Sequence, residues 1–116
     1  MGLDQYMWKR LNEESEPEEI AYWRKTRHIQ NWMERVWREQ GNTGDFNLAP
    51  LPMTHEILDK LEVDIAHNKL QEHDAAGFFF GHSDFDEDDK QSLLSTIIRC
   101  RKAIDEGYNV WYDSWW

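Results

Sequence analysis

Apolar residues recur at helical spacing through residues 18–40, and this pattern constrains the fold more than any other feature of the chain. Pro17 followed by two glutamates is typical of a helix start, because carboxylates suit the exposed amide groups there. Gly41 is typical of a helix end. The spacing therefore predicts a helix from about Glu18 to Gln40 with one side facing a core. That side comprises Tyr22, Thr26, Ile29, Met33, Val36 and Trp37.

Two further segments show the same spacing. The first is predicted to form a helix from about Thr54 to Gln71, whose core side comprises Ile57, Leu58, Leu61 and Ile65. The second is predicted to run from about Phe85 to Glu106 and to end at Gly107, and Asp84 with Glu87 has the spacing of a capping pair at its start. Its core side comprises Leu93, Leu94, Ile97, Ile98 and Ile104.

Shorter segments favour extended structure. Tyr6 and Trp8 lie on one side of a period-two pattern near the start, which predicts a short strand. The end of the chain alternates in the same way, with Tyr108, Val110 and Tyr112 against Asn109, Trp111 and Asp113. GFFFG at 77–81 predicts a buried strand or a tight aromatic loop, and the prolines of residues 46–52 exclude regular helix there. We therefore expect one α+β domain over residues 1–116, with about three helices packed on a small antiparallel sheet.

The composition limits the kinds of function. A chain of 116 residues can bury about two-thirds of its extended surface, so a real core is available. The formal net charge of -10 argues against nonspecific nucleic-acid binding, and it suits either a basic partner or an anion held in a local basic pocket. No apolar run is long enough to span a bilayer, and the start lacks the order of a signal peptide. We expect a protein of the cytoplasm that does not contact membranes.

Known chemical motifs are absent from the sequence. Alternating aspartates at 84–88 suggest a calcium loop, but Asp89 and Ser95 stand where that loop requires glycine and glutamate. The histidines form no zinc motif, and the glycines of GFFFG are too far apart to cradle phosphate. The single cysteine, Cys100, excludes a disulfide framework, and its place in a helical pattern predicts an inert, partly buried thiol. We expect no cofactor, no metal and no enzymatic activity.

The segment YWRKTRHIQNWMERVWR, residues 22–38, is basic in an otherwise acidic chain. On the predicted helix, one flank beside the core side gathers Arg24, Lys25, His28, Trp32 and Arg35. Two interpretations stand. The cations pair with the protein's own carboxylates, or they form an anion pocket in which arginine holds phosphate and an aromatic ring stacks on a flat ligand.

Several motifs in order resemble a family of small uncharacterised proteins of bacteriophages and prophages. They are the start MGLDQYMWKR, the motif YWRKTRHIQNW, GFFFG followed by an acidic helix start, and the end WYDSWW. The chain departs from the family pattern at Thr26 and Arg27, and at 113–115. The resemblance implies a phage-encoded accessory protein in the bacterial cytoplasm, with these motif residues: Tyr22, Trp23, Arg24, Lys25, Trp32, Gly77, Phe78, Phe79, Phe80, Gly81, Tyr112, Ser114 and Trp115.

Together these features predict a non-enzymatic binding protein that acts against host defence by holding a small anionic, nucleotide-like ligand. The pocket is expected where the basic segment, GFFFG and the C-terminal aromatics converge. Its predicted residues are Tyr22, Trp23, Arg24, Lys25, His28, Trp32, Arg35, Phe79, Tyr112 and Trp115.

Other interpretations stay open. The acidic segment NEESEPEE, the second helix and DFDEDD form an acidic surface that would fit a basic host protein, as a nucleic-acid mimic does. Seven tryptophans exceed the need of a small core, and a homodimer through Trp111, Trp115 or Trp116 would explain the surplus. A structural domain with an unknown partner is a further alternative. An enzyme would instead show a cleft with at least two convergent titratable groups.

Overall fold

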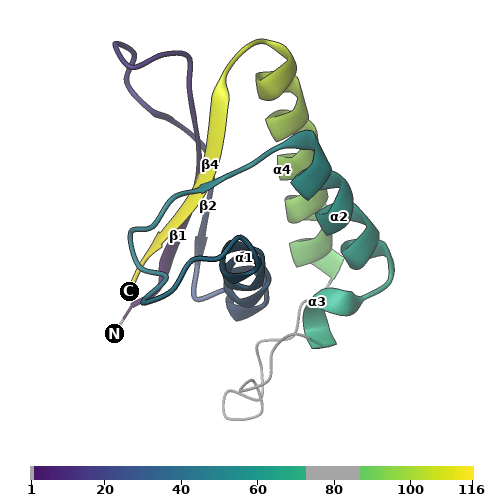
Figure 1. Ribbon diagram of the computed structural model, residues 1–116. Helices are drawn as coiled ribbons and strands as arrows, with labels where there is room; N and C mark the ends of the chain where they lie inside the picture. The colour runs from purple at the N-terminus through teal and green to yellow at the C-terminus, as the bar shows by residue number, and fades with distance from the viewer. Residues whose placement is uncertain (1, 73–86) are drawn as a thin grey trace.

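A four-stranded antiparallel sheet with the strand order β2-β1-β4-β3 carries all the helices on one side (Figure 1). The computed structural model describes residues 2–72 and 87–116. Its elements are β1 (Asp4–Arg10), β2 (Glu18–Arg24), α1 (Arg27–Glu39), β3 (Leu51–Pro52), α2 (His55–Ala66), the short α3 (Lys69–Glu72), α4 (Glu87–Asp105) and β4 (Asn109–Trp115). This arrangement confirms the predicted α+β fold of about three helices on a small antiparallel sheet.

The two central strands separate a buried face of the sheet from an open one. Side chains alternate between the faces of a strand, and β1 pairs with β4 so that Met7 lies opposite Tyr112 and Trp8 lies opposite Trp111. Met7 and Tyr112 are fully buried beneath the helices, whereas Trp8 and Trp111 are only partly buried. The alternation predicted at both ends of the chain is therefore confirmed, and it creates an open face that no described helix covers.

The helices close one apolar core over the buried face. Ile29, Met33, Val36 and Trp37 of α1 are buried, as the helical spacing predicts. Leu58, Leu61 and Ile65 of α2 and Leu93 and Ile97 of α4 join the same cluster. Ile98 is the exception, because 68% of its surface is exposed, and its assignment to the core was wrong.

The predicted helix from Glu18 to Gln40 is wrong in its first third. Residues Glu18–Arg24 form the strand β2, and α1 begins only at Arg27. Tyr22 consequently lies on the open face with 45% of its surface exposed instead of facing the core. Ile20 and Trp23 are the buried residues of this strand, and they and Tyr22 belong to the aromatic and β-branched types that favour strands.

Long-range contacts determine that residues 18–24 form a strand and that α1 starts after it. The Lys25 N–H donates to the Leu3 carbonyl at 2.8 Å, and Lys25 adopts a left-handed backbone conformation with φ of 56° that reverses the chain. The Gln5 side-chain amide then donates to the Thr26 carbonyl at 2.9 Å and accepts from the Thr26 N–H at 2.8 Å. These bonds hold the start of α1 against β1, and local spacing within residues 18–40 contains no sign of them.

The remaining boundaries follow backbone conformation. α1 ends where predicted, with Gly41 at φ of 95°. The predicted second helix is divided into α2 and α3 by Asn68, whose φ is 56°. α4 ends before Gly107 as expected. The GFFFG segment, the capping pair at Asp84 and the first residues of the predicted third helix lie outside the described residues.

Candidate functional site

Two of the three predicted pocket residues of α1 are buried in the protein interior, and the third is exposed. Trp32 is a core residue with 2% of its surface exposed, and its indole Nε1 donates to a carboxylate oxygen of Asp64 at 2.8 Å. His28 is buried too, and its Nδ1 lies 3.2 Å from the Leu70 carbonyl oxygen. Arg35 is exposed, with its Nε 3.8 Å from a carboxylate oxygen of Glu39. Trp32 and His28 thus contact the protein interior, not a surface pocket.

The other predicted residues lie on both faces of the sheet. Arg24 and Lys25 are exposed at the end of β2 and in the turn that follows. Trp23 and Tyr112 meet beneath the helices, with ring centroids 6.3 Å apart. Tyr22 and Trp115 lie on the open face, and Trp115 has 61% of its surface exposed. Phe79 lies outside the described residues. The structure therefore brings Trp23 together with Tyr112, but it does not gather the nine described residues of the predicted pocket into one site.

A closed hydrogen-bond network surrounds Tyr112 on the buried face. The Tyr112 hydroxyl donates to Oε1 of Gln30 at 2.6 Å and accepts from Nε2 of Gln5 at 3.0 Å. Nε2 of Gln30 in turn donates to the Ser114 hydroxyl at 3.0 Å. Burial raises the pKa of Tyr112 far above that of a free phenol. The network fixes β1, α1 and β4 together, and each of its polar groups is bonded within the protein.

The open face carries a row of aromatic rings across β2 and β1. The rings of Tyr6 and Trp8 are stacked with centroids 5.1 Å apart, and Tyr22 lies beside Tyr6 at 5.2 Å. The Tyr22 hydroxyl donates to Asp4 at 2.6 Å, which raises the pKa of Tyr22. The indole of Trp8 donates to Asp113 at 3.0 Å. We call Tyr22, Tyr6 and Trp8 the ring row.

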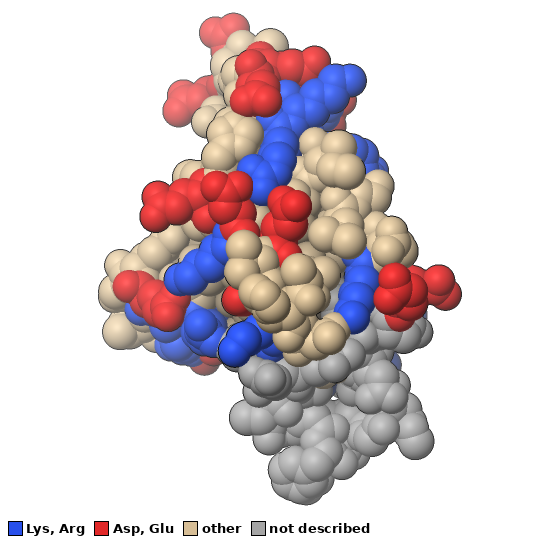
Figure 2. All heavy atoms as spheres, turned by 90° about the vertical axis from the view of Figure 1, so that its right-hand side faces the viewer, with Lys and Arg blue, Asp and Glu red and all other residues tan. Residues whose placement is uncertain are grey.

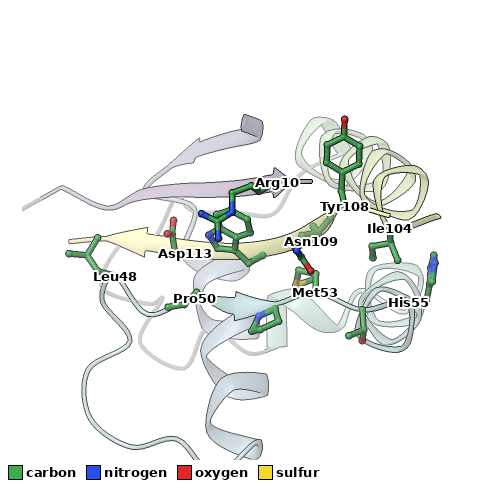
Figure 3. Close-up of a pocket in the computed structure, with 13 residues that line it drawn as sticks. Arg10, Leu48, Pro50, Met53, His55, Ile104, Tyr108, Asn109 and Asp113 are labelled. Carbon is green, nitrogen blue, oxygen red and sulfur yellow. The ribbon is translucent and has the colours of Figure 1, made fainter. Parts of the chain in front are cut away.

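Beside the ring row, a groove of about 830 Å³ follows β4 at the edge formed by β3. In Figure 3, Leu48 and Asp113 lie at one end of the groove, His55 and Ile104 lie at the other, and Arg10 lies between them. Trp111 lines it from β4, together with Pro50, Pro52, Met53, Thr54, Tyr108, Asn109 and Val110. Proline is tolerated at this place because β3 is an edge strand.

Arg10 is the cation inside this groove. Its guanidinium lies over the Trp111 ring, with the central carbon 5.9 Å from the ring centroid. Its Nε atom is buried and has no hydrogen-bond partner in the part of the chain that the structure describes. A buried donor without a partner costs about 1–3 kcal/mol, and a water, an ion or a ligand would each supply the missing acceptor.

The other charged groups of the groove are bonded within the protein. His55 Nε2 lies 2.9 Å from a carboxylate oxygen of Asp105, and Asp113 accepts the hydrogen bond from Trp8. Asp59, four residues after His55 on α2, forms an ion pair with Arg101 at 2.7 Å. Arg10 is therefore the group of this groove that an anion would meet.

Acidic and basic side chains alternate on the face formed by α2 and α4 (Figure 2). Arg101 contacts both Asp59 at 2.7 Å and Glu62 at 2.9 Å, and Lys60 lies 3.6 Å from Glu39. These pairs neutralise part of the second helix's predicted acidic surface. DFDEDD lies partly outside the described residues, so the nucleic-acid mimic stays a prediction.

Other reactive groups have ordinary structural roles. Burial raises the pKa of Cys100 to about 12, which keeps the thiol protonated, and the cysteine is fully buried where the sequence predicted partial burial. Within residues 2–72 and 87–116, no cluster of three histidine, cysteine, aspartate or glutamate side chains is arranged to hold a metal. No helix in the same ranges is long and apolar enough to cross a bilayer.

Sequence reasoning did not assign Arg10 to a binding site, and it considered Trp111 only as a homodimer contact. Both belong to period-two patterns that the sequence displays, with Arg10 following Tyr6 and Trp8, and Trp111 preceding Asp113. Pairing of the first and last strands would have placed these residues on one face. The register that aligns Trp8 with Trp111 depends on packing between the two ends of the chain, so the separate patterns did not reveal it.

The fold and the groove define a small α+β protein with an open aromatic sheet face and an adjoining ligand-sized groove. Comparisons of the chain with protein-family models, curated proteins and solved structures give no match.

Proposed function

We propose that this protein binds a small anionic ligand with a flat ring, such as a nucleotide, in the groove around Arg10. The observation that carries the proposal is the buried, unpartnered Nε of Arg10 above the Trp111 ring. Arginine provides several donors for a phosphate group, and a tryptophan face accepts a flat ring. The same two chemical functions were predicted for the basic segment, and the proposal transfers them to Arg10 and Trp111.

The size and lining of the groove support this class of ligand. Sites for small molecules commonly measure about 300–1,000 Å³ and combine apolar walls with a few polar groups. The groove volume of about 830 Å³ falls in this range, and Pro50, Pro52 and Met53 provide apolar walls. An anion would gain the Arg10 donors without displacing an ion pair, because the guanidinium's contact is with the Trp111 ring.

The proposal is of binding without catalysis. A general acid and a general base have to converge on the same reacting group of the ligand. His55 and Asp113 are titratable candidates, but they lie at opposite ends of the groove and do not converge (Figure 3). The sequence resemblance to phage proteins supports a role in the host cytoplasm, where sequestration of a nucleotide signal would weaken a host defence.

Isothermal titration calorimetry against mono-, di- and cyclic nucleotides tests the proposal. We expect at least one nucleotide to bind, and Arg10→Ala to weaken its affinity at least about tenfold, because a charged hydrogen bond contributes about 1.5–3 kcal/mol. Arg35→Ala is the matched control, since Arg35 is an exposed arginine of α1 that neither lines the groove nor belongs to the open face of the sheet. Absence of binding by every nucleotide at 1 mM, or equal loss in both variants, would contradict the proposal.

A further inference from the structure

The groove and the ring row adjoin on the open face. Trp8, at the end of the ring row, lies directly opposite Trp111 in the pairing of β1 with β4. Arg10 is two residues further along β1, so its side chain emerges on the same face as that of Trp8. Directly paired residues on neighbouring strands have their Cβ atoms about 4.5–5.5 Å apart. The cation thus lies beside the pair of tryptophans at which the ring row and the groove adjoin.

The ring row is held in place by carboxylates. Asp4 fixes the Tyr22 hydroxyl at 2.6 Å, and Asp113 fixes the Trp8 indole at 3.0 Å. No described helix covers the row, and its outer ring, Tyr22, has 45% of its surface exposed. Rings that are already oriented lose little conformational entropy when a flat group packs on them. The row is therefore a preorganised surface next to the groove.

We infer that the ligand carries two flat rings joined through phosphate, as a dinucleotide does. This inference rests on the proposed function and specifies its ligand. One ring packs on Trp111, the phosphate meets Arg10, and the second ring packs on the ring row. A mononucleotide would occupy the groove alone and leave the ring row exposed.

Charge limits the ligand to this short length. Arg10 is the cation that lines the groove, and Arg24 lies on the same face opposite Asp4, whereas Asp4 and Asp113 are carboxylates of that face. The chain has a formal net charge of -10, so each additional phosphate would meet repulsion. Longer single strands depend on a continuous row of cations along the backbone, whereas Arg10 and Arg24 lie at opposite ends of β1, with the two carboxylates toward the Arg24 end.

Calorimetry with the intact protein compares 5′-AMP, the dinucleotide pApA and a hexa-adenylate, and it is repeated with guanine, cytosine and uracil forms. We expect the dinucleotide to bind roughly 5- to 150-fold more tightly than the mononucleotide, the gain from one base stacked on aromatic rings. The hexamer should bind no more tightly than the dinucleotide. Equal affinities of mono- and dinucleotide would overturn this inference while leaving the proposed function intact, and a tighter hexamer would replace it with single-strand binding.

Two substitutions at the exposed end of the row provide the matched control. Tyr22→Leu removes the ring and should reduce the dinucleotide's advantage over the mononucleotide at least threefold. Tyr22→Phe keeps the ring, loses the bond to Asp4 and should retain most of the advantage. An unchanged advantage in Tyr22→Leu would contradict packing on the row. Failure of every mononucleotide and dinucleotide to bind would instead contradict the proposed function.

Discussion

The two faces of the sheet use the same kinds of side chain in opposite ways. On the buried face, Tyr112 and the glutamines 5 and 30 bond to one another. On the open face, Arg10 lies on the Trp111 ring with its Nε unpartnered among the described residues. The buried face therefore satisfies its own polar groups, whereas the open face leaves a donor of Arg10 and exposed aromatic rings for a ligand.

The two tryptophans that best represent this comparison are Trp32 in the core and Trp111 on the open face. We expect Trp32→Ala to lower the free energy of unfolding by about 3–5 kcal/mol, because it empties a buried site and leaves Asp64 without its indole donor. Trp111→Ala should cost less, since that ring is partly in solvent. Urea unfolding followed by circular dichroism measures both.

The unfolding measurements on these two variants also test the ligand pocket that the sequence predicted around Trp32. If Trp32→Ala left stability unchanged and removed nucleotide binding, the predicted pocket on α1 would be correct and the comparison of the two faces would fail. Equal losses of stability in Trp32→Ala and Trp111→Ala would show that the open face is part of the structural core.

A smaller effect is expected inside the hydrogen-bond network of the buried face. Tyr112→Phe removes a hydroxyl that serves both Gln30 and Gln5, and their amide groups remain buried. Unsatisfied buried polar groups cost about 1–3 kcal/mol, so urea unfolding should show a loss of that size. Tyr22→Phe is the matched control on the open face, where loss of the bond to Asp4 should change stability by about 0.5 kcal/mol or less. Similar losses in both variants would contradict the distinction between the faces.

Much of the fold could be predicted because its signals are local. The apolar spacing of α2 and α4 depends on residues within one helix, and Gly41 and Gly107 mark helix ends through their backbone conformation. The alternation around Tyr6 and Tyr112 likewise appears within single strands. Each of these elements was identified in the sequence, apart from details of their boundaries.

The start of α1 could not be predicted in the same way. Ile20 and Trp23 fit a strand, but Tyr22 and Ile29 also fit the stripe of a longer helix, so the local patterns conflict. The conflict is resolved by pairing with β1 and by the contact of Gln5 with Thr26. These bonds join segments that the sequence separates.

The candidate site around Arg10 could not be predicted from the sequence for the same reason. The concentration of positive charge predicted a site on the basic segment, yet Trp32 and His28 of that segment face the interior. Arg10 stands between Lys9 and Leu11 in the chain, where nothing distinguishes it from other surface arginines. Its unpartnered Nε and its contact with Trp111 exist only after β1 has paired with β4.

The smallest expected effect on stability gives the most specific test of Arg10. Arg10→Met removes a cation–π contact that contributes about 0.5–1 kcal/mol, but it also removes the cost of a buried, unpartnered Nε. The unbranched methionine keeps contact with Trp111. We therefore expect the free energy of unfolding, measured in urea, to stay within about 0.5 kcal/mol or to rise.

Lys9→Met is the matched control for this last prediction. The Lys9 ammonium lies 4.7 Å from the Tyr108 ring centroid, and no buried nitrogen is relieved when it is removed. This variant should lose up to about 1 kcal/mol with nothing to offset the loss. If Arg10→Met instead lost more than Lys9→Met, the Arg10 guanidinium would be a structural contact of the folded chain. The open face would then resemble the buried face, and the groove would lose the group that distinguishes it as a binding site.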